Sequence, residues 1–287
     1  MTKRKTIIVT GGTGLLGSTL IRLLEKTGHN VKAPRLELTD RKAVMSFADS
    51  CSSVDWIVHT SAMTDVERCE REQRLCYSIN VGGTRHIREL ARQYGAKLLY
   101  ISTVSVFSGK EGNYRENDMP YPTNFYSLTK LLGEEAVQEY PTGIVLRLNL
   151  VGIHPNGPHG RNLMEWLVNC AEKNKNMKLF TDIMVNPLSN WTAAHFISTL
   201  IAKEPDERIL HLGTGNVVSK ADIGKQVLDA FPSYRGGVEF ESVGNGINGV
   251  VRPKETWLNT EKAEHAVGLK MPTVQEEVKT ILANYKY

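Results

Sequence analysis

Tyr126 and Lys130 are two residues whose chemistry and spacing suit proton transfer. They are four positions apart, which places both side chains on one face of a helix. A lysine charge near a tyrosine favours the phenolate, so we expect Tyr126 to exchange a proton with a substrate oxygen near neutral pH. Thr103 follows a predicted strand, and its hydroxyl could bind that same oxygen. The pattern predicts a catalytic set, with an ordinary surface pair on a helix as the alternative.

A glycine-rich segment near the N-terminus predicts a phosphate-binding loop. Glycines stand at positions 11, 14 and 17, directly after a predicted strand and at the start of a predicted helix. Gly11 permits a sharp turn, Gly14 brings backbone N–H groups near a pyrophosphate, and Gly17 lets the helix pack against the sheet. The expected cofactor contacts also include Thr13, Leu15 and Leu16. A glycine-rich turn without a ligand is the alternative.

The end of the second predicted strand indicates which nucleotide binds. An acidic residue there would hydrogen-bond the ribose hydroxyls of NAD, but residues 32–35 read Lys-Ala-Pro-Arg. The guanidinium of Arg35 suits a 2′-phosphate, so we expect NADP, with NAD as the alternative cofactor and a solvated surface arginine as the alternative for Arg35. Glu37 and Leu38 lie where this fold often contacts the adenine. Thr39 or Asp40 could cap the next helix at the same time.

Short β-branched runs alternate with helical patterns along the first half of the chain. This alternation is typical of βαβ units, and it predicts an α/β fold with a doubly wound parallel sheet of six strands. Ligands of such a sheet bind beyond the carboxyl ends of its strands. The expected strands include residues 6–10, 29–32, 56–59, 97–102 and 143–148, and the expected helices include residues 15–26, 41–49, 79–94 and 126–140.

The pattern loosens after residue 150, which predicts a second, smaller unit. Residues 154–160 have the composition of a loop, whereas residues 163–172 and 274–287 have helical periodicity. We therefore expect a dinucleotide-binding Rossmann domain over residues 1–150. Residues 151–287 should form mainly a substrate-binding lobe, with some segments returning to the first domain.

Composition disfavours several other classes of function. The net charge is +4, from 35 basic and 31 acidic residues spread along 287 positions, which suits an anionic ligand but is too small for a nucleic-acid partner. Apolar runs are shorter than the roughly 18 residues that span a bilayer, and no signal-peptide pattern follows Met1. We expect a cytoplasmic protein without a membrane partner. The four cysteines lack metal-ligand spacing, so we expect no metal.

The chain resembles the extended short-chain dehydrogenase/reductase family and, within it, the dTDP-4-dehydrorhamnose reductases. The resemblance covers the whole length and includes the glycine loop and the Tyr126/Lys130 pair. It also includes residues 61–70, 80–84, 101–109 and 122–126 and the pair Arg252-Pro253. The resemblance implies a nicotinamide-dependent reductase of a keto sugar nucleotide, in which Tyr126 is the acid, Thr103 orients the oxygen and Lys130 tunes the phenol. A homodimer is a further expectation.

The same resemblance assigns further residues to the two ligands. Along the cofactor it implies Ser61, Ala62 and Met63, with Lys130 on the nicotinamide ribose. The residues that could line the substrate cleft are Val104, Ser105, Phe107, Asn149, Leu150 and Arg252. For Phe107 and Asn149, core packing or a satisfied loop is an equal alternative. Arg252, in a loop before a proline, suits a nucleotide diphosphate.

Two positions depart from the reductase pattern, and both lie on the substrate side. Val104-Ser105 stands where those reductases have Asp-Tyr, and Leu150 stands where they place a tryptophan that stacks on the substrate. Val104 and Ser105 also cannot supply the acid and base of related dehydratases, so dehydration is disfavoured. Two alternatives stay open: a sugar-nucleotide epimerase with tightly bound NAD, and a non-catalytic, NADP-binding regulatory subunit.

Overall fold

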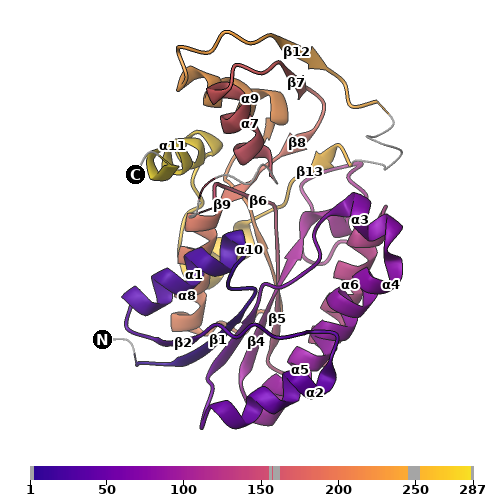
Figure 1. Ribbon diagram of the computed structural model, residues 1–287, viewed down its shortest axis with the longest axis vertical. Helices are drawn as coiled ribbons and strands as arrows, with labels where there is room; N and C mark the ends of the chain where they lie inside the picture. Colours follow the sequence, from indigo (N-terminus) through magenta and orange to yellow (C-terminus); the bar gives the residue numbers. More distant parts are fainter. Residues whose placement is uncertain (1–2, 155–156, 158–161, 245–252, 286–287) are drawn as a thin grey trace.

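A six-stranded parallel sheet forms the centre of the computed structural model, which describes residues 3–154, 157, 162–244 and 253–285. In space the strands follow the order β10, β5, β4, β3, β1, β2, and each neighbouring pair is parallel (Figure 1). The predicted α/β fold with a doubly wound sheet is confirmed. The strands are β1 (Thr6–Thr10), β2 (Asn30–Lys32), β3 (Trp56–His59), β4 (Lys97–Thr103), β5 (Gly143–Leu148) and β10 (Ile209–Leu212).

Side chains alternate between the two faces of the sheet because successive residues of a strand point in opposite directions. In β1, Ile7 and Val9 belong to one apolar core and Ile8 to another, and all three are fully buried. In β3, Trp56 lies on the first face and Ile57 on the second. Both faces are apolar, so helices must cover both.

The helices that cover the sheet come from both halves of the chain. One face packs against α1 (Leu15–Lys26), α8 (Asn190–Lys203) and α10 (Glu261–Val267), and the other against α2 (Arg41–Ser46), α5 (Gly83–Tyr94) and α6 (Phe125–Gln138). The predicted helix over residues 15–26 has its predicted limits. The helices predicted over residues 41–49 and 79–94 were less accurate at the ends. α2 continues as the 3-10 segment η1 (Phe47–Ser50), and α5 follows α3 (Val66–Arg71), α4 (Gln73–Tyr77) and the π-helical segment η2 (Ser78–Gly82).

The sixth strand of the sheet comes from the second half of the chain. β10 pairs with β5, from Ile209 opposite Val145 to Leu212 opposite Leu148. Together with α8 and α10, it belongs to the same apolar core as α1. Residues beyond position 150 therefore complete the sheet as well as forming a second core.

This second core lies at the end of the sheet where β5 leads into β6 (Figure 1). Its apolar residues come mainly from three helices and the short strands between them. The helices are α7 (Leu163–Glu172), α9 (Lys220–Asp229) and α11 (Val274–Tyr285). The strands here pair as β6 (Leu150–Val151) with β9 (Leu188–Ser189), β7 (Met177–Phe180) with β12 (Val238–Glu241), and β8 (Met184–Val185) with both β11 (Val218–Ser219) and β13 (Glu255–Thr256).

A buried ion pair joins α6 to the sheet. Glu134 of α6 is fully buried and accepts hydrogen bonds from the guanidinium of Arg147 on β5 at 2.7–3.1 Å. The same carboxylate accepts a hydrogen bond from the Ser102 hydroxyl of β4 at 2.5 Å. Arg147 also donates to Nε2 of His211 on β10 at 3.2 Å, and Nδ1 of His211 lies 2.9 Å from the carbonyl of Tyr114. Three strands and one helix thus share a single charged cluster.

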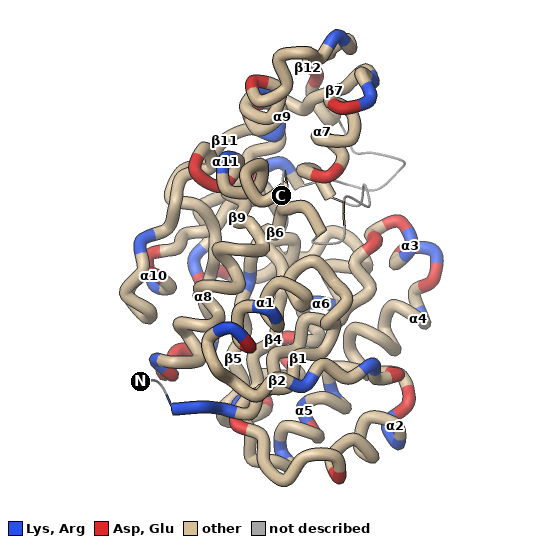
Figure 2. The backbone as a smooth tube through the Cα atoms, turned by 60° about the vertical axis from the view of Figure 1, so that its left-hand side comes forward, with Lys and Arg blue, Asp and Glu red and all other residues tan. Residues whose placement is uncertain are grey.

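The surface carries charges of both signs along the outer helices, including α2 and α3 (Figure 2). Exposed pairs such as Arg41 with Glu89, at 2.7 Å, join neighbouring elements. None of the helices in the described ranges combines the length and apolar character that crossing a bilayer requires.

Replacing Glu134 by Gln should destabilise the protein by about 3–5 kcal/mol, because the change leaves the Arg147 guanidinium buried without its counter-charge. The matched control is Glu135→Gln on the exposed side of the same helix. Urea denaturation of both variants measures the effect. Equal unfolding free energies for the two variants would contradict this account of the cluster.

Candidate active site

The glycine loop between β1 and α1 is tightly wound. Gly11 has a φ of +71°, a conformation that favours glycine, and its carbonyl accepts a hydrogen bond from the N–H of Gly14 at 2.9 Å. A Cβ atom at position 17 would lie only 2.3 Å from that same carbonyl oxygen. The loop backbone and the first turn of α1 are therefore in closer contact than any other residue type would permit.

The N-terminus of α1 lacks a side-chain cap. Its N-cap residue is Gly14, which has no side chain to accept a hydrogen bond from the first-turn N–H groups. By contrast, the N-cap side chains of α6, α7, α8 and α9 all accept hydrogen bonds from their own first turns. Uncapped N–H groups and the positive end of the helix dipole suit an anion, so a pyrophosphate fits this end of α1.

Two cavities adjoin the loop on its two sides. One, of about 680 Å³, is lined by residues 11–13, 33–36 and 61. The other, of about 470 Å³, begins at residues 14–17 and extends to the predicted catalytic residues. Both cavities lie along the edge of the sheet that contains the carboxyl ends of β1 and β4. A doubly wound sheet binds its dinucleotide at this edge. The residues present therefore fit a nicotinamide dinucleotide.

The residues predicted to contact the cofactor are divided between these cavities and the core. Arg35, Thr13 and Ser61 line the first cavity, and the Arg35 side chain is exposed. Leu15, Leu16 and Ala62 line the second. Glu37 is exposed and accepts a hydrogen bond from the Thr39 hydroxyl at 2.7 Å, whereas Leu38 is buried in the core beneath α2 and α5. Asp40 caps α2, and it is one of the two residues, Thr39 and Asp40, that the sequence offered as the cap.

Thr103, Tyr126 and Lys130 line the same cavity as Gly14 and Gly17. Thr103 is the last residue of β4, and its side-chain oxygen accepts a hydrogen bond from the N–H of Ser105 at 3.2 Å, while its hydroxyl also interacts with Tyr126. Tyr126 is half-buried in the first turn of α6. The ammonium of Lys130 donates to the carbonyl of Ile101 at 2.7 Å, and its nitrogen lies 4.0 Å from the centre of the Tyr100 ring.

The protonation of this set differs from the sequence-based expectation. Burial raises the pKa of Tyr126 to about 12, and a hydrogen bond from Thr103 acts in the opposite direction. Burial also lowers the pKa of Lys130 to about 7, although the charge of Glu134 raises it. The expectation that the Lys130 charge lowers the pKa of Tyr126 was wrong for this state, because burial raises that pKa and Lys130 is not among the groups that shift it. The phenol is protonated at neutral pH, which suits the donation of a proton.

Asn80 is a buried residue to which the sequence analysis gave no role. Its side chain accepts from the N–H of Met63 at 2.8 Å, donates to the Met63 carbonyl at 3.1 Å, and donates to the Thr129 hydroxyl of α6 at 3.0 Å. It thereby fixes the segment after β3 against the helix that carries Tyr126. Met63 itself is buried with Cys69 and Cys76, so its side chain contributes to packing. The signal was present, because the segment 80–84 carried part of the resemblance.

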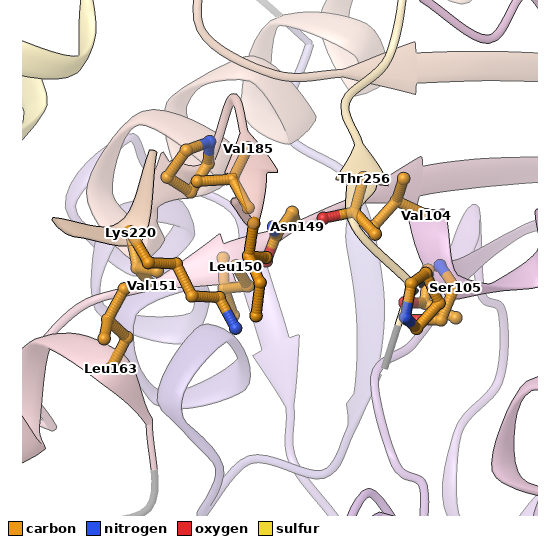
Figure 3. A pocket seen from close by; sticks show the side chains of 13 residues that line it. Val104, Ser105, Asn149, Leu150, Val151, Leu163, Val185, Lys220 and Thr256 are labelled. Atoms are coloured by element: carbon orange, nitrogen blue, oxygen red, sulfur yellow. Dashed lines mark hydrogen bonds between the residues drawn. The ribbon is translucent and has the colours of Figure 1, made fainter. Parts of the chain in front are cut away.

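A third cavity, of about 220 Å³, adjoins Thr103 on the side of the second core. It is lined by four of the residues predicted on the substrate side, namely Val104, Ser105, Asn149 and Leu150 (Figure 3). Phe107 does not reach it. That ring is 1% exposed and stacks on Tyr114 with the ring centres 4.3 Å apart, so packing, the alternative stated for Phe107, describes its position. Arg252 lies outside the described residues.

Comparison with known proteins places the chain in a family. The RmlD substrate binding domain family matches residues 5–287. A dTDP-4-dehydrorhamnose reductase from Aggregatibacter actinomycetemcomitans is 26% identical and aligns over 96% of this chain and 98% of its own. A probable low-salt glycan biosynthesis reductase, Agl14, from Haloferax volcanii is 24% identical over 96% of this chain and 97% of its own.

Solved structures agree with this comparison. The dTDP-4-dehydrorhamnose reductase of Yersinia enterocolitica superposes with a TM-score of 0.87 at 26% identity, over 99% of this chain and 100% of the other. The enzyme of the same name from Bacillus anthracis, solved in complex with NADP, superposes with a TM-score of 0.89 at 24% identity, over 98% of this chain and 99% of the other. The chain belongs to the RmlD substrate binding domain family and is an NAD(P)-dependent oxidoreductase of the extended short-chain dehydrogenase/reductase type.

Proposed function

We propose that this protein is an NADP(H)-dependent reductase of a keto sugar nucleotide, with Tyr126 as its general acid. The observation that carries the proposal is the convergence of Thr103, Tyr126 and Lys130 on the cavity that begins at the glycine loop. A hydroxyl, a protonated phenol and an amine meet there beside a site that fits a dinucleotide phosphate. The names of the similar proteins, several of them dTDP-4-dehydrorhamnose reductases, support the substrate class.

Each of the three residues has a separate task in this proposal. When bound, NADPH would supply the hydride that reduces the keto carbon. Thr103 donates its hydroxyl hydrogen to the keto oxygen and so orients it, since its own oxygen already accepts from Ser105. Tyr126 gives its proton to that oxygen as negative charge develops there. Lys130, held between Ile101 and Tyr100, binds the nicotinamide ribose and restrains the neighbouring turn of α6.

In this proposal the substrate occupies the third cavity, which lies beside Thr103 on the side of the second core. Val104, Ser105, Asn149 and Leu150 line this side, and the second core forms the lobe that covers the sugar nucleotide. The homodimer and the cytoplasmic location expected from the sequence stay predictions.

The direct test measures NADPH oxidation by the purified protein with a panel of 4-keto sugar nucleotides. We expect turnover with at least one of them. Tight NADP binding without turnover of any substrate would instead favour the regulatory alternative. Bound NAD that survives purification, with interconversion of sugar epimers, would favour the epimerase.

Replacing Arg35 by Ala should weaken NADP binding about 10- to 100-fold, because one charge-assisted contact with the 2′-phosphate is lost. NAD binding should change little. Arg41→Ala is the matched control, since Glu89 holds that guanidinium on the surface. Fluorescence titration with each cofactor measures the effect, and an equal loss for NADP and NAD would show that Arg35 does not read the phosphate.

Tyr126→Phe keeps the aromatic ring and removes only the hydroxyl. Turnover should fall about 10²- to 10⁴-fold, the usual contribution of a positioned general acid, while cofactor affinity stays nearly unchanged. Lys130→Met should reduce turnover and also weaken NADP, because it removes the proposed ribose contact. The measurements are steady-state rates with the active keto substrate and a separate cofactor titration. A Tyr126→Phe enzyme with the full wild-type rate would refute the catalytic assignment.

A further inference from the structure

The two cysteines of α3 and α4 lie together in a small buried cluster that contacts Tyr126. Cys69 of α3 and Cys76 of α4 are fully buried and belong to one apolar cluster with Met63. The rings of Phe125 and Tyr126 pack against this cluster. Both short helices contact α6, the helix that carries Tyr126 (Figure 1). The proposed function gives the two cysteines no role.

The two sulfur atoms are held by the same pair of polar groups. The Cys69 thiol donates to the carbonyl of Met63 at 3.6 Å. The side-chain nitrogen of Asn80 donates both to that carbonyl, at 3.1 Å, and to the Cys76 sulfur, at 3.4 Å. On the side of α6, the Cys76 sulfur lies 3.5 Å from the Thr129 hydroxyl. Both cysteines are free thiols in this structure, so they form a reduced dithiol in contact with α6.

One of the two thiols has the character of a nucleophile. A hydrogen bond with the Cys69 thiol lowers the pKa of Cys76 to about 7, and Thr129 acts in the same direction, although burial opposes both. The same pairing, together with burial, raises the pKa of Cys69. Because the thiolate is the reactive form of cysteine, Cys76 is the thiol that attacks an oxidant first, and Cys69 is placed to resolve the product.

The segment that carries the dithiol is held to the protein by few buried groups. Among residues 66–77, all of which the structure describes, only the two cysteines are buried. α3 has six residues and α4 has five, and Glu72 between them has a backbone that is not helical, with φ −114° and ψ 49°. Segments with few buried contacts open locally at a low cost in free energy. Such opening exposes the thiols to a small oxidant while the sheet stays folded.

A disulfide at this place would disturb the first turn of α6. It brings two sulfur atoms to about 2.05 Å, well inside non-bonded contact, so the sulfurs leave the positions that they occupy as thiols. Cys76 loses its contact with Thr129, and the apolar surface under Phe125 and Tyr126 changes shape. Because proton donation requires a positioned donor, a displacement of about 1 Å can lower turnover about 10²-fold.

We propose that Cys69 and Cys76 form an oxidisable dithiol, and that its conversion to a disulfide loosens the first turn of α6 and lowers the activity of the site. The oxidant is a low-molecular-weight disulfide such as oxidised glutathione. The effect on activity rests on the proposed function, whereas the disulfide and the loosened turn do not.

The oxidation proceeds by two exchanges of thiol and disulfide. The Cys76 thiolate attacks one sulfur of oxidised glutathione, which forms a mixed disulfide and releases one glutathione thiolate. Cys69 then loses its proton and attacks the Cys76 sulfur, so that the second glutathione leaves. The two released thiolates take up the protons that the cysteines lost. Two protein thiols are thereby oxidised by two electrons, and one small disulfide is reduced to two thiols.

The test treats the purified protein with oxidised glutathione, removes the excess and digests the protein with trypsin without reduction. Arg71 and Arg74 lie between the two cysteines, so a disulfide joins the peptide of residues 69–71 to that of residues 75–85. Hydrogen exchange over residues 125–130 should accelerate in the oxidised protein and return to its initial rate after dithiothreitol. Turnover of an active keto sugar nucleotide should fall about 10- to 100-fold and recover in the same way.

Variants of single cysteines, each compared with its own reduced state, test the order of the two steps. Cys69→Ala should stop at a glutathione mixed disulfide on Cys76, whereas Cys76→Ala should stay unmodified at Cys69 and keep its exchange and turnover. Cys170→Ala removes a buried cysteine of α7 in the second core, so it is the matched control and should respond as the wild type does.

The outcomes separate the dithiol from the proposed function. The absence of the joined peptide, the same response in Cys76→Ala, or a disulfide that leaves exchange over residues 125–130 or turnover unchanged would each overturn the inference. A disulfide that accelerates this exchange in a protein that reduces no keto sugar nucleotide would support the dithiol and contradict the reductase.

Discussion

The ion pair between Glu134 and Arg147 is the constraint on which the geometry of the site depends. Two charges in the interior are stable only when each has its partner and its remaining hydrogen bonds, so the elements that supply those partners have little freedom to move. Glu134 lies one helical turn after Lys130 and accepts from Ser102, the residue directly before Thr103. Arg147 lies two residues before Asn149. The cluster therefore fixes the helix that carries Tyr126 and Lys130 together with two strand ends.

The same cluster explains how the second half of the chain is held to the sheet. His211 of β10 completes the guanidinium's hydrogen bonds through its unprotonated Nε2, while its Nδ1 is directed at the Tyr114 carbonyl. Burial and the Arg147 charge lower the pKa of this imidazole to about 3, so it stays neutral at physiological pH. A protonated His211 would place a second positive charge against Arg147, which the neutral ring avoids.

Much of the fold was predictable because its signals are local in the sequence. The glycine loop, α1, α7 and the first strands were found from residues close together, since periodicity and turn residues act over short distances. β10 could not be found in this way. It has four residues, and its partner β5 lies more than 60 positions earlier, so only the folded chain shows the pairing.

In the candidate site, too, the features that were predicted depend on nearby residues, and those that were missed depend on the folded chain. The spacing of Tyr126 and Lys130 predicted one helix face, but the protonation of both groups depends on burial, which spacing cannot provide. The resemblance implied that Phe107 could line the substrate cleft, with core packing as an equal alternative, and the structure shows the packing, because its ring stacks on Tyr114. The role of Asn80 comes from contacts between segments far apart in the sequence, which the residue type at that position does not indicate.

The cofactor side and the proposed substrate side of the site are built from different kinds of groups. This difference determines which residues can be substituted while the fold is kept. The cofactor side consists largely of backbone: a tight turn at Gly11, a helix N-terminus without a side-chain cap, and strand ends held by the buried ion pair. Few side chains there can change without disturbing the fold. The proposed substrate side consists of side chains that line the cavity beside Thr103, such as Val104 and Leu150, which can change while the sheet is kept. The departures from the reductase pattern at Val104, Ser105 and Leu150 fall on this side, so in the proposed function they bear on which sugar fits, whereas the glycine loop and the Tyr126/Lys130 pair are retained.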